Sequence, residues 1–419
     1  MDFSAFLQSY ERPARKGIRI NTLKLTAEEF ERIAPFPLLG EVSWEKNGRY
    51  VEEEKLGGYV EHFAGLFYSQ EPSAMSAVPL LNVQPGERVL DLCAAPGGKT
   101  TQIAQAMRGE GVLIANEYVY DRAKILAQNV ERLGVKNCAV VSADCAYLAE
   151  AYPASFDKIL VDAPCSGEGM FKKETAAIAE WSVDNVLCCA ARQAEILDCA
   201  AKLLKVGGQM VYSTCTFAEE EDGEQIANFL KRHGEFELLH RNTLFPHEAA
   251  GEGHFVALLK KTDGEPSPRL RAEEANCREM AKRAFEAFLD DFFAVKPQFL
   301  VETDGSTDEL LTAIPEGLPC LAERGISRLR KGLVLGTYAN KIFKPSHALA
   351  MSVKREEVNR FVSLDREESE RYLRGETVSS DLSNGWCVVG MGEYPLGIGK
   401  IVNGTVKNHY PKGLRMFRK

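Results

Sequence analysis

The sequence lacks the long apolar runs of membrane proteins and the cysteine spacing of secreted or zinc-binding ones. No stretch reaches the ~20 consecutive apolar residues that a membrane-spanning helix needs. The segment from Met1 to Gly17 does not have the charged-then-apolar order of a signal peptide. The 11 cysteines are odd in number and contain no Cys-x-x-Cys pair, which argues against a disulfide framework and a structural zinc site. We therefore expect a cytoplasmic protein that has no metal and does not bind membranes.

The chain also has no overall excess of positive charge. Its net charge of −9 argues against phosphate binding by the whole surface, so a nucleic-acid partner would have to be held by local patches. Two stretches without Asp or Glu could form such patches, and a solvated basic face would explain each of them equally well. They contain Arg12, Arg15, Lys16, Arg19 and Lys24 near the N-terminus, and Lys400, Lys407, Lys412, Arg415, Arg418 and Lys419 at the C-terminus.

The middle of the chain alternates strand-like and helix-like runs. This alternation predicts parallel βαβ units and an open, doubly wound α/β sheet. The expected strands are 88–92, 112–117, 139–143, 158–161 and 209–214, with a closing pair at 236–239 and 255–259, and the main helices are 100–107, 121–133 and 183–204, the last ending at Gly207-Gly208. The residues 262–271 form the clearest linker, because they combine glycine, prolines and charges. Beyond it we expect a helix over 272–293 and then short strands, with a hairpin at Asn403-Gly404.

Acids and cysteines follow all five central strands. In an open α/β sheet, ligands bind outside the carboxyl ends of the strands, so these side chains should meet at one edge. They are Asp91, Glu117, Asp144, Asp162 with Cys165, and Cys215. Scattered core packing would not produce this arrangement, which predicts a functional site.

The loop after the first strand fits two kinds of ligand. Cys93 to Thr100 matches the phosphate-binding pattern G-x-x-x-x-G-K-[ST] except at the first position, where Cys93 replaces a conformationally free glycine. Glu117 follows Gly97 by 20 residues, where an acid binds ribose hydroxyls in nucleoside-binding folds. The loop therefore suits an adenosine cofactor better than a nucleoside triphosphate. An NTPase stays the alternative, and ATP binding without S-adenosylmethionine binding would favour it.

If the cofactor is S-adenosylmethionine, each strand end has a role. The small residues Ala94, Ala95, Gly97 and Gly98 let the backbone approach the methionine part of the cofactor. Glu117 would bind the ribose hydroxyls, and Asp144 would accept from the adenine amino group. Asp91 either contacts the cofactor or caps the following turn.

Cys165 and Cys215 suggest the reaction. Carbon-5 of cytosine becomes nucleophilic when a thiolate adds to carbon-6, and it can then accept a methyl group before the thiolate is expelled. Asp162 is placed to stabilise the adduct. The alternative is that both cysteines are buried thiols without a chemical role.

Four motifs carry a resemblance to a known family. They are Tyr68-Ser-Gln-Glu-Pro72, Asp91-Leu-Cys-Ala-Ala-Pro-Gly-Gly-Lys-Thr100, Asp162-Ala-Pro-Cys-Ser-Gly167 and Ser213-Thr-Cys-Thr216. The segment 68–261 that contains them resembles the Sun/Fmu-type (NOL/NOP/Sun) RNA cytosine-5 methyltransferases, and Gly17-Ile-Arg-Ile-Asn-Thr-Leu-Lys24 is similar to that group's N-terminal element.

Further segments are similar to the RsmF-like branch of that family, which methylates 16S rRNA. These are Gly167-Glu-Gly-Met-Phe-Lys172, Gly332-Leu-Val-Leu-Gly-Thr337 and Pro345-Ser-His-Ala-Leu349, and the stretch from Gly385-Trp-Cys-Val-Val389 to Lys412-Gly-Leu-Arg415 looks like its PUA-like RNA-binding module. The resemblance is weaker over 31–59 and in the linker.

The resemblance implies a role for each cysteine. Cys215 would be the nucleophile, and Cys165 would aid breakdown of the covalent adduct, whereas DNA cytosine-5 methyltransferases use the cysteine of the Pro-Cys motif. The implied cofactor-binding positions are Cys93, Ala94, Ala95, Pro96, Gly97, Gly98, Lys99, Glu117, Arg122, Asp144 and Asp162.

We expect RNA to contact several regions. Phe171 either stacks on the extruded base or fills a gap, and Lys172 and Lys173 could meet flanking phosphates. More distant RNA would contact Arg19, Lys407, Lys412 and Arg415. The expected partner is 16S rRNA or the 30S subunit, bound by a monomer. The alternatives are a tRNA substrate and a catalytically idle rRNA-binding assembly factor.

The expected domains are derived from these motifs. They are an N-terminal α+β RNA-binding element (1–75), a Rossmann-like methyltransferase domain (76–261), the linker (262–271), a helical or α+β connecting domain (272–350) and a β-rich, PUA-like RNA-binding domain (351–419).

Overall fold

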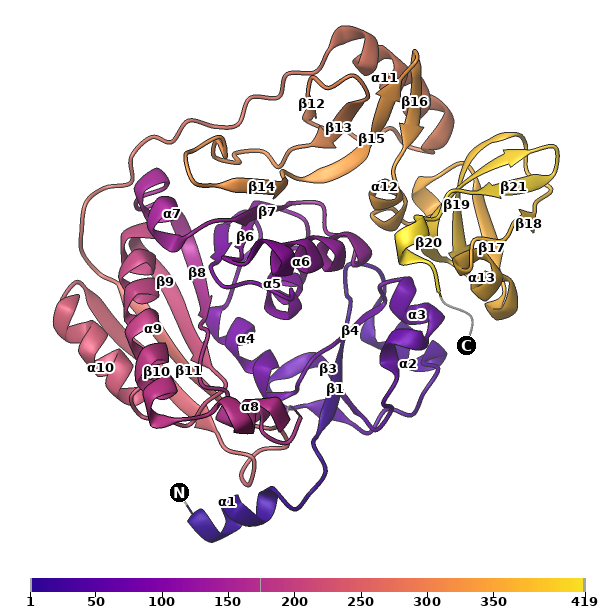
Figure 1. The fold of residues 1–419 in the computed structure, drawn as a ribbon. Helices are drawn as coiled ribbons and strands as arrows, with labels where there is room; N and C mark the ends of the chain where they lie inside the picture. The colour runs from indigo at the N-terminus through magenta and orange to yellow at the C-terminus, as the bar shows by residue number, and fades with distance from the viewer. Residues whose placement is uncertain (1, 174, 417–419) are drawn as a thin grey trace.

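The computed structural model describes residues 2–173 and 175–416 (Figure 1). Arg418 and Lys419 of the C-terminal basic stretch lie outside the described residues. Within the described ranges, no helix is both long enough and apolar enough to cross a membrane.

An eight-stranded sheet forms the centre of the molecule. Its strand order is β10-β11-β9-β8-β5-β6-β7-β14. The bounds are β5 (Arg88–Asp91), β6 (Val112–Asn116), β7 (Cys138–Ser142), β8 (Phe156–Asp162), β9 (Leu204–Thr214), β10 (Phe236–Leu244), β11 (His254–Lys261) and β14 (Ser327–Arg330). Strands β5 to β9 are parallel, whereas β10, β11 and β14 pair antiparallel. The chain runs outward from β5 to β7 and returns to β8 beside β5, which creates a switch point between β5 and β8 where ligands bind in such sheets.

Helices cover both faces of this sheet, as expected for a doubly wound fold. Neighbouring strand residues point to opposite faces, so Val89 packs with α4 (Ala77–Leu81), α5 (Gly98–Met107) and α6 (Tyr120–Arg132). Leu90 packs on the other face with α7 (Cys145–Ala151), α9 (Val183–Leu203) and α10 (Gly223–Arg232). Because both faces are buried, the central strands are continuous apolar runs.

The N-terminal residues form a small sheet of their own. Its order is β2-β3-β1-β4, with β1 (Lys16–Ile20), β2 (Glu41–Val42), β3 (Glu45–Val51) and β4 (Phe67–Ser69). Three short helices accompany it: α1 (Phe3–Ser9), α2 (Ala27–Ile33) and α3 (Val60–Phe63).

The C-terminal part contains two further sheets. The first has the order β12-β13-β15-β16 and comprises β12 (Val301–Thr303), β13 (Glu309–Ala313), β15 (Leu333–Ala339) and β16 (Ile342–Pro345), with helices α11 (Glu279–Phe292) and α12 (His347–Met351). The second has the order β17-β19-β20-β21-β18 and comprises β17 (Phe361–Leu364), β18 (Val378–Ser379), β19 (Gly385–Met391), β20 (Tyr394–Val402) and β21 (Thr405–Asn408), with helix α13 (Arg366–Leu373). The hairpin expected at Asn403-Gly404 is confirmed, since both residues have positive φ and connect β20 to β21.

The last sheet shares one hydrophobic core with the N-terminal sheet. Ile18, Phe30 and Phe67 belong to the same buried cluster as Tyr372 and Ile401. In Figure 1, helices α2 and α3 of the N-terminal region lie beside the C-terminal sheet, so the N-terminal and C-terminal regions pack together.

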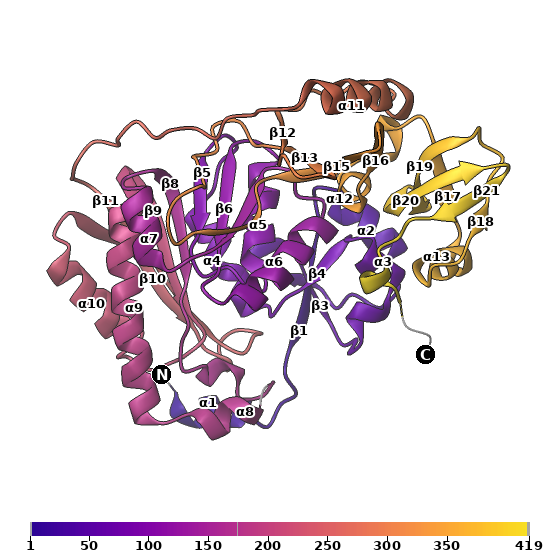
Figure 2. The ribbon, with the colours of Figure 1, turned by 45° about the horizontal axis from the view of Figure 1, so that its top comes forward.

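Two local expectations were wrong, and the central sheet contains one strand that the sequence analysis did not assign to it. The helix expected from residue 272 begins at Glu279, because Ala272 pairs with Pro319 as an isolated bridge at the end of the extended segment visible along the top of Figure 2. The Gly207-Gly208 pair lies inside β9, and α9 ends earlier, at Leu203. Strand β14 comes from beyond the linker yet pairs with β7 and extends the central sheet.

Candidate active site

The loops after the parallel strands meet at one edge of the sheet, as the sequence predicted. Asn116, the last residue of β6, ties three of them together. Its side-chain nitrogen donates to the carbonyl oxygens of Leu92 and Ala143, both at 3.1 Å, and its side-chain oxygen accepts from the amide of Ala143 at 3.0 Å. Its own carbonyl oxygen accepts from the amide of Ala94 at 2.8 Å. Sequence reasoning missed Asn116, because it sought charged or sulfur-containing groups.

The loop from Leu92 to Gly97 is held against α6. Arg122 donates to the carbonyl oxygen of Ala95 at 2.9 Å, and Asn129 donates to that of Pro96 at 2.9 Å. Gly97 has a φ of 111°, and a Cβ there would lie 3.0 Å from Cδ1 of Leu126. The chain therefore leaves β5 in a turn that only glycine fits well and enters α5 with its first amide groups free for a ligand.

Asp91 lies fully buried beneath this loop. One carboxylate oxygen accepts from the hydroxyl of Thr100 at 2.6 Å, and the other has no hydrogen-bond partner within the protein. Burial raises the pKa of Asp91 to about 7.

Glu117 and Asp144 stand at the ends of the next two strands, each with one carboxylate oxygen bonded to the backbone. Glu117 accepts from the amide of Val119 at 2.9 Å, and its other oxygen lies 3.6 Å from a guanidinium nitrogen of Arg122. Asp144 is exposed and caps α7 by accepting from the amide of Ala146 at 2.9 Å. The second oxygen of each group remains for a ligand.

Asp162, at the end of β8, is the centre of a polar cluster. It forms an ion pair with Lys99 at 2.8 Å and accepts from the hydroxyl of Ser213 at 2.8 Å. Burial opposes its ionisation, but the charges and hydrogen bonds around it, Lys99 foremost, hold the pKa of Asp162 below its usual range. The carboxylate is therefore ionised, and 33% of its side chain is exposed.

Cys165 and Cys215 are in direct contact. Their sulfur atoms lie 3.2 Å apart, and the amide of Cys215 donates to the sulfur of Cys165 at 3.4 Å. The hydrogen bond to Cys215 and burial raise the pKa of the Cys165 thiol, so Cys165 keeps its proton. The amide of Gly169 donates to the carbonyl oxygen of Cys215 at 2.8 Å and fixes the two loops together.

Two of the expected RNA contacts are corrected by the structure. Arg19 is only 1% exposed, and its guanidinium bonds internally to Gln105, Gln70, Thr101 and the carbonyl oxygen of Gly98. Because Arg19 belongs to the N-terminal basic stretch, it was expected to contact RNA at the surface. Its hydrogen bonds instead connect parts of the protein interior. Lys172 forms an ion pair with the buried Glu252 at 3.2 Å, so its ammonium group binds a carboxylate inside the protein.

The other expected RNA contacts lie at or near the surface. Phe171 is half-buried, next to the exposed Lys173. Lys407 and Lys412 are exposed at the end of the last sheet, and Arg415 is half-buried over Gly375. These residues lie in two separate regions of the chain, and only Phe171 and Lys173 follow the Cys165 loop.

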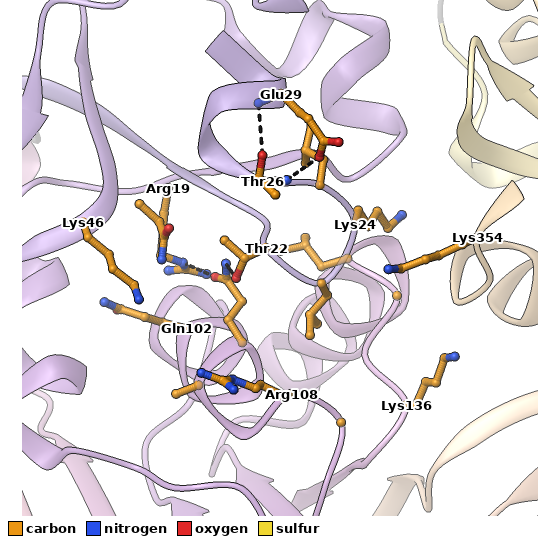
Figure 3. A pocket seen from close by; sticks show the side chains of 18 of the residues that line it. Arg19, Thr22, Lys24, Thr26, Glu29, Lys46, Gln102, Arg108, Lys136 and Lys354 are labelled. Carbon is orange, nitrogen blue, oxygen red and sulfur yellow. Dashed lines mark hydrogen bonds between the residues drawn. The ribbon is translucent and has the colours of Figure 1, made fainter. Parts of the chain in front are cut away.

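A large cavity lies apart from the cysteine site. It has a volume of about 1420 Å³ and lies between the N-terminal sheet, α5 and the segment after α12 (Figure 3). Its wall includes residues 82–85, 109, 133, 134, 136 and 137, which precede β5, β6 and β7 and so lie at the opposite edge of the sheet. Lys46, Arg108, Lys136 and Lys354 line it together with acids such as Glu29, which caps α2.

Across 2–173 and 175–416, no group of three or more His, Cys, Asp or Glu side chains could hold a metal ion.

Four family models match successive parts of the chain. The model described as 16S rRNA methyltransferase RsmB/F matches residues 78–264. Those described as the N-terminal domain of 16S rRNA methyltransferase RsmF, the RsmF rRNA methyltransferase first C-terminal domain and the methyltransferase RsmF PUA domain match residues 1–72, 292–353 and 359–416.

Similar proteins are found among curated sequences and solved structures. Ribosomal RNA small subunit methyltransferase F of Klebsiella pneumoniae (strain 342) is 34% identical over 451 residues, which cover 99% of this chain and 93% of that protein. A methyltransferase homolog from Pyrococcus horikoshii is 30% identical, with a TM-score of 0.55 over 61% of this chain and 90% of that one. NSun6 from Pyrococcus horikoshii with SFG has a TM-score of 0.56 at 21% identity, covers 62% of this chain and 94% of that chain, and supports the fold alone.

Proposed function

The chain belongs to the family of ribosomal RNA small subunit methyltransferase F, the S-adenosylmethionine-dependent RNA methyltransferases of the RsmB/F type, and from that premise we propose how it acts. The proposed reaction is methylation of carbon-5 of a cytidine in 16S rRNA through a covalent adduct with Cys215. The observation that carries the proposal is the contact between Cys165 and Cys215 beside an ionised Asp162.

The residues at the strand ends fit S-adenosylmethionine. Asp91 has a buried oxygen without a partner, and the loop from Cys93 through Ala94, Ala95, Pro96 and Gly97 to Gly98 brings backbone close to the space above it. Glu117, oriented by Val119 and Arg122, would bind the ribose hydroxyls, and Asp144 the adenine amino group. The bound cofactor supplies an electrophilic methyl group.

The two cysteines would divide the work on the base. Cys215 adds through its sulfur to carbon-6 of cytosine, which places an electron pair on carbon-5 for methylation. Cys165, still protonated, donates to the sulfur of Cys215 and stabilises negative charge there. After methylation, a base takes the carbon-5 proton and the bond between carbon-6 and the Cys215 sulfur breaks, which restores the ring and releases Cys215 as a thiolate; Cys165 lies close enough to assist.

Asp162 and Lys99 would act as a pair. Lys99 keeps Asp162 ionised, so its carboxylate can accept a hydrogen bond from the exocyclic amino group of the cytosine and hold the base in place. Lys99, expected from the sequence to bind the cofactor, would therefore also act on the reacting base through Asp162.

RNA would contact two separate regions of the chain. Phe171 and Lys173 follow the Cys165 loop and would meet nucleotides next to the target, whereas Lys407, Lys412 and Arg415 of the C-terminal sheet would contact more distant phosphates. We propose the domain division 1–75, 76–261, 272–350 and 351–419 around linker 262–271, and action as a cytoplasmic monomer on 16S rRNA or the 30S subunit.

The test is methyl transfer from labelled S-adenosylmethionine to 30S subunits, free 16S rRNA and bulk tRNA. We expect 5-methylcytosine in 16S rRNA with the wild type and none with Cys215→Ala, because the nucleophile is gone. Cys188→Ala, which removes an exposed thiol on α9, is the matched control and should stay active.

Three other results would change the proposed substrate, nucleophile or activity. Label in tRNA alone would show that tRNA, and not 16S rRNA, is the substrate. An active Cys215→Ala variant together with an inactive Cys165→Ala variant would show that Cys165 is the nucleophile. Cofactor binding without transfer to any RNA would favour an rRNA-binding assembly factor.

A further inference from the structure

His254 is a buried polar side chain that neither the cofactor site nor the cysteine pair uses. It is the first residue of β11 and is 1% exposed, and neither of its ring nitrogens has a hydrogen-bond partner within the protein. Buried polar groups are nearly always hydrogen-bonded, so two unpartnered nitrogens on one ring need an explanation.

The topology brings His254 to the reaction site. Because β11 is antiparallel to β9, the amino end of β11 lies at the edge where the parallel strands end, and Phe255 pairs with Thr214, next to Cys215. Neighbouring Phe255 and Val256 face opposite sides of the sheet, so His254 shares the face of Val256, which is covered by α4 and α5.

His254 faces Asp162 at a distance just beyond a hydrogen bond. Its Nε2 lies 3.9 Å from Oδ1 of Asp162, the oxygen that accepts from Ser213. The ring is enclosed, whereas the Asp162 side chain is one-third exposed and can turn toward a base. A movement of about 1 Å would close the gap to a hydrogen bond.

The ring is also uncharged. Burial and the nearby charge of Lys99 lower the pKa of His254 to about 3, so the imidazole is neutral at physiological pH. A neutral donor can hold the Asp162 carboxylate in place without a second positive charge competing for it.

We propose that His254 is a positioning residue that donates an Nε2–H hydrogen bond to Asp162 once the target cytosine is bound and so fixes the carboxylate against the base. This inference rests on the proposed function, since it assigns His254 a part in the same site. The hydrogen bond forms with the substrate in place, so it acts on the chemical step more than on binding.

The test compares two substitutions of similar size. His254→Phe keeps a flat ring and removes both nitrogens, and His254→Gln keeps a neutral N–H. We expect His254→Phe to lower kcat about tenfold or more, the usual effect of losing a hydrogen bond to a charged group, with KM for RNA and Kd for S-adenosylmethionine within twofold of wild type. His254→Gln should recover most of kcat.

The control is His347→Phe, at another buried, neutral histidine, which packs against Tyr410 at the far end of the chain. It should leave kcat unchanged. A His254→Phe variant as active as wild type, or a folded His254→Gln variant as slow as His254→Phe, would overturn the positioning role alone. Wild-type protein that methylates no RNA would instead overturn the proposed function, and this inference with it.

Discussion

At the residue scale, the buried acids at the ends of the strands differ in charge. Its pKa lies below the usual range because Lys99 offsets burial, whereas burial leaves Asp91 with a pKa of about 7. Cys165 keeps its proton and His254 is neutral. The site therefore combines an ionised carboxylate, a protonated thiol and a neutral imidazole.

Glu117 offers a direct test of the cofactor site. Glu117→Ala should raise Kd for S-adenosylmethionine at least tenfold, because it removes the carboxylate that Val119 and Arg122 orient toward the ribose position. Isothermal titration calorimetry measures the change. Glu150→Ala, at an exposed position of α7, is the control, and equal cofactor binding by both variants would contradict the assignment of Glu117.

At the element scale, the turn between β5 and α5 depends on conformation as much as on side chains. Gly97 takes a left-handed φ of 111° and approaches Leu126, while Asn116 links this turn to the loops after β6 and β7. The loops at the edge of the sheet where the cofactor would bind thus form one connected unit.

A methyl group at Gly97 should disturb that unit. Gly97→Ala adds a left-handed strain of about 1–2 kcal/mol and a 3.0 Å contact with Leu126, so we expect lower thermal stability and weaker cofactor binding. Gly109→Ala shares the positive φ but has open space around it, so it should lower stability and leave cofactor affinity unchanged. If the two variants bind the cofactor equally well, the turn does not shape the site.

The sequence was informative where structure depends on local pattern. Apolar runs predicted the parallel strands, and the rule that ligands gather at their carboxyl ends brought Asp91, Glu117, Asp144, Asp162 and Cys215 to one edge. The hairpin at Asn403-Gly404 could be predicted from the φ angles that these residues tolerate.

Features that depend on contacts distant in sequence could not be predicted. His254 was missed because it begins an antiparallel strand, whereas the rule applies to residues at the carboxyl ends of parallel strands. Arg19 was misplaced because its partners lie 51 to 86 residues away, and nothing local marks it as buried. Strand β14 carries no sign in its own sequence that it will join β7.

At the scale of the whole molecule, the two ends of the chain support each other. Phe30 and Phe67 share a core with Tyr372, and the fully buried Glu61 of the N-terminal region pairs with Arg366 of α13. The C-terminal sheet is therefore part of the framework that carries the N-terminal sheet.

Arg366→Ala should accordingly destabilise a region far from its own sequence. It leaves the Glu61 carboxylate buried and unpaired, which costs about 2 kcal/mol when the lost partner is half-exposed. Hydrogen exchange should show faster opening around α3 and β4. Arg283→Ala, which breaks an exposed pair within α11, is the control, and protection unchanged by Arg366→Ala would contradict the shared framework.

The most direct test of the account is to trap the covalent intermediate. Purified Cys165→Ala is incubated with 16S rRNA and S-adenosylmethionine and analysed on a denaturing gel for a protein–RNA complex. The account predicts a stable complex with Cys165→Ala, because adduct breakdown is slowed, and none with Cys165→Ala/Cys215→Ala. A complex that persists in the double variant, or one that forms with Cys215→Ala instead, would contradict the assignment of Cys215 as the nucleophile.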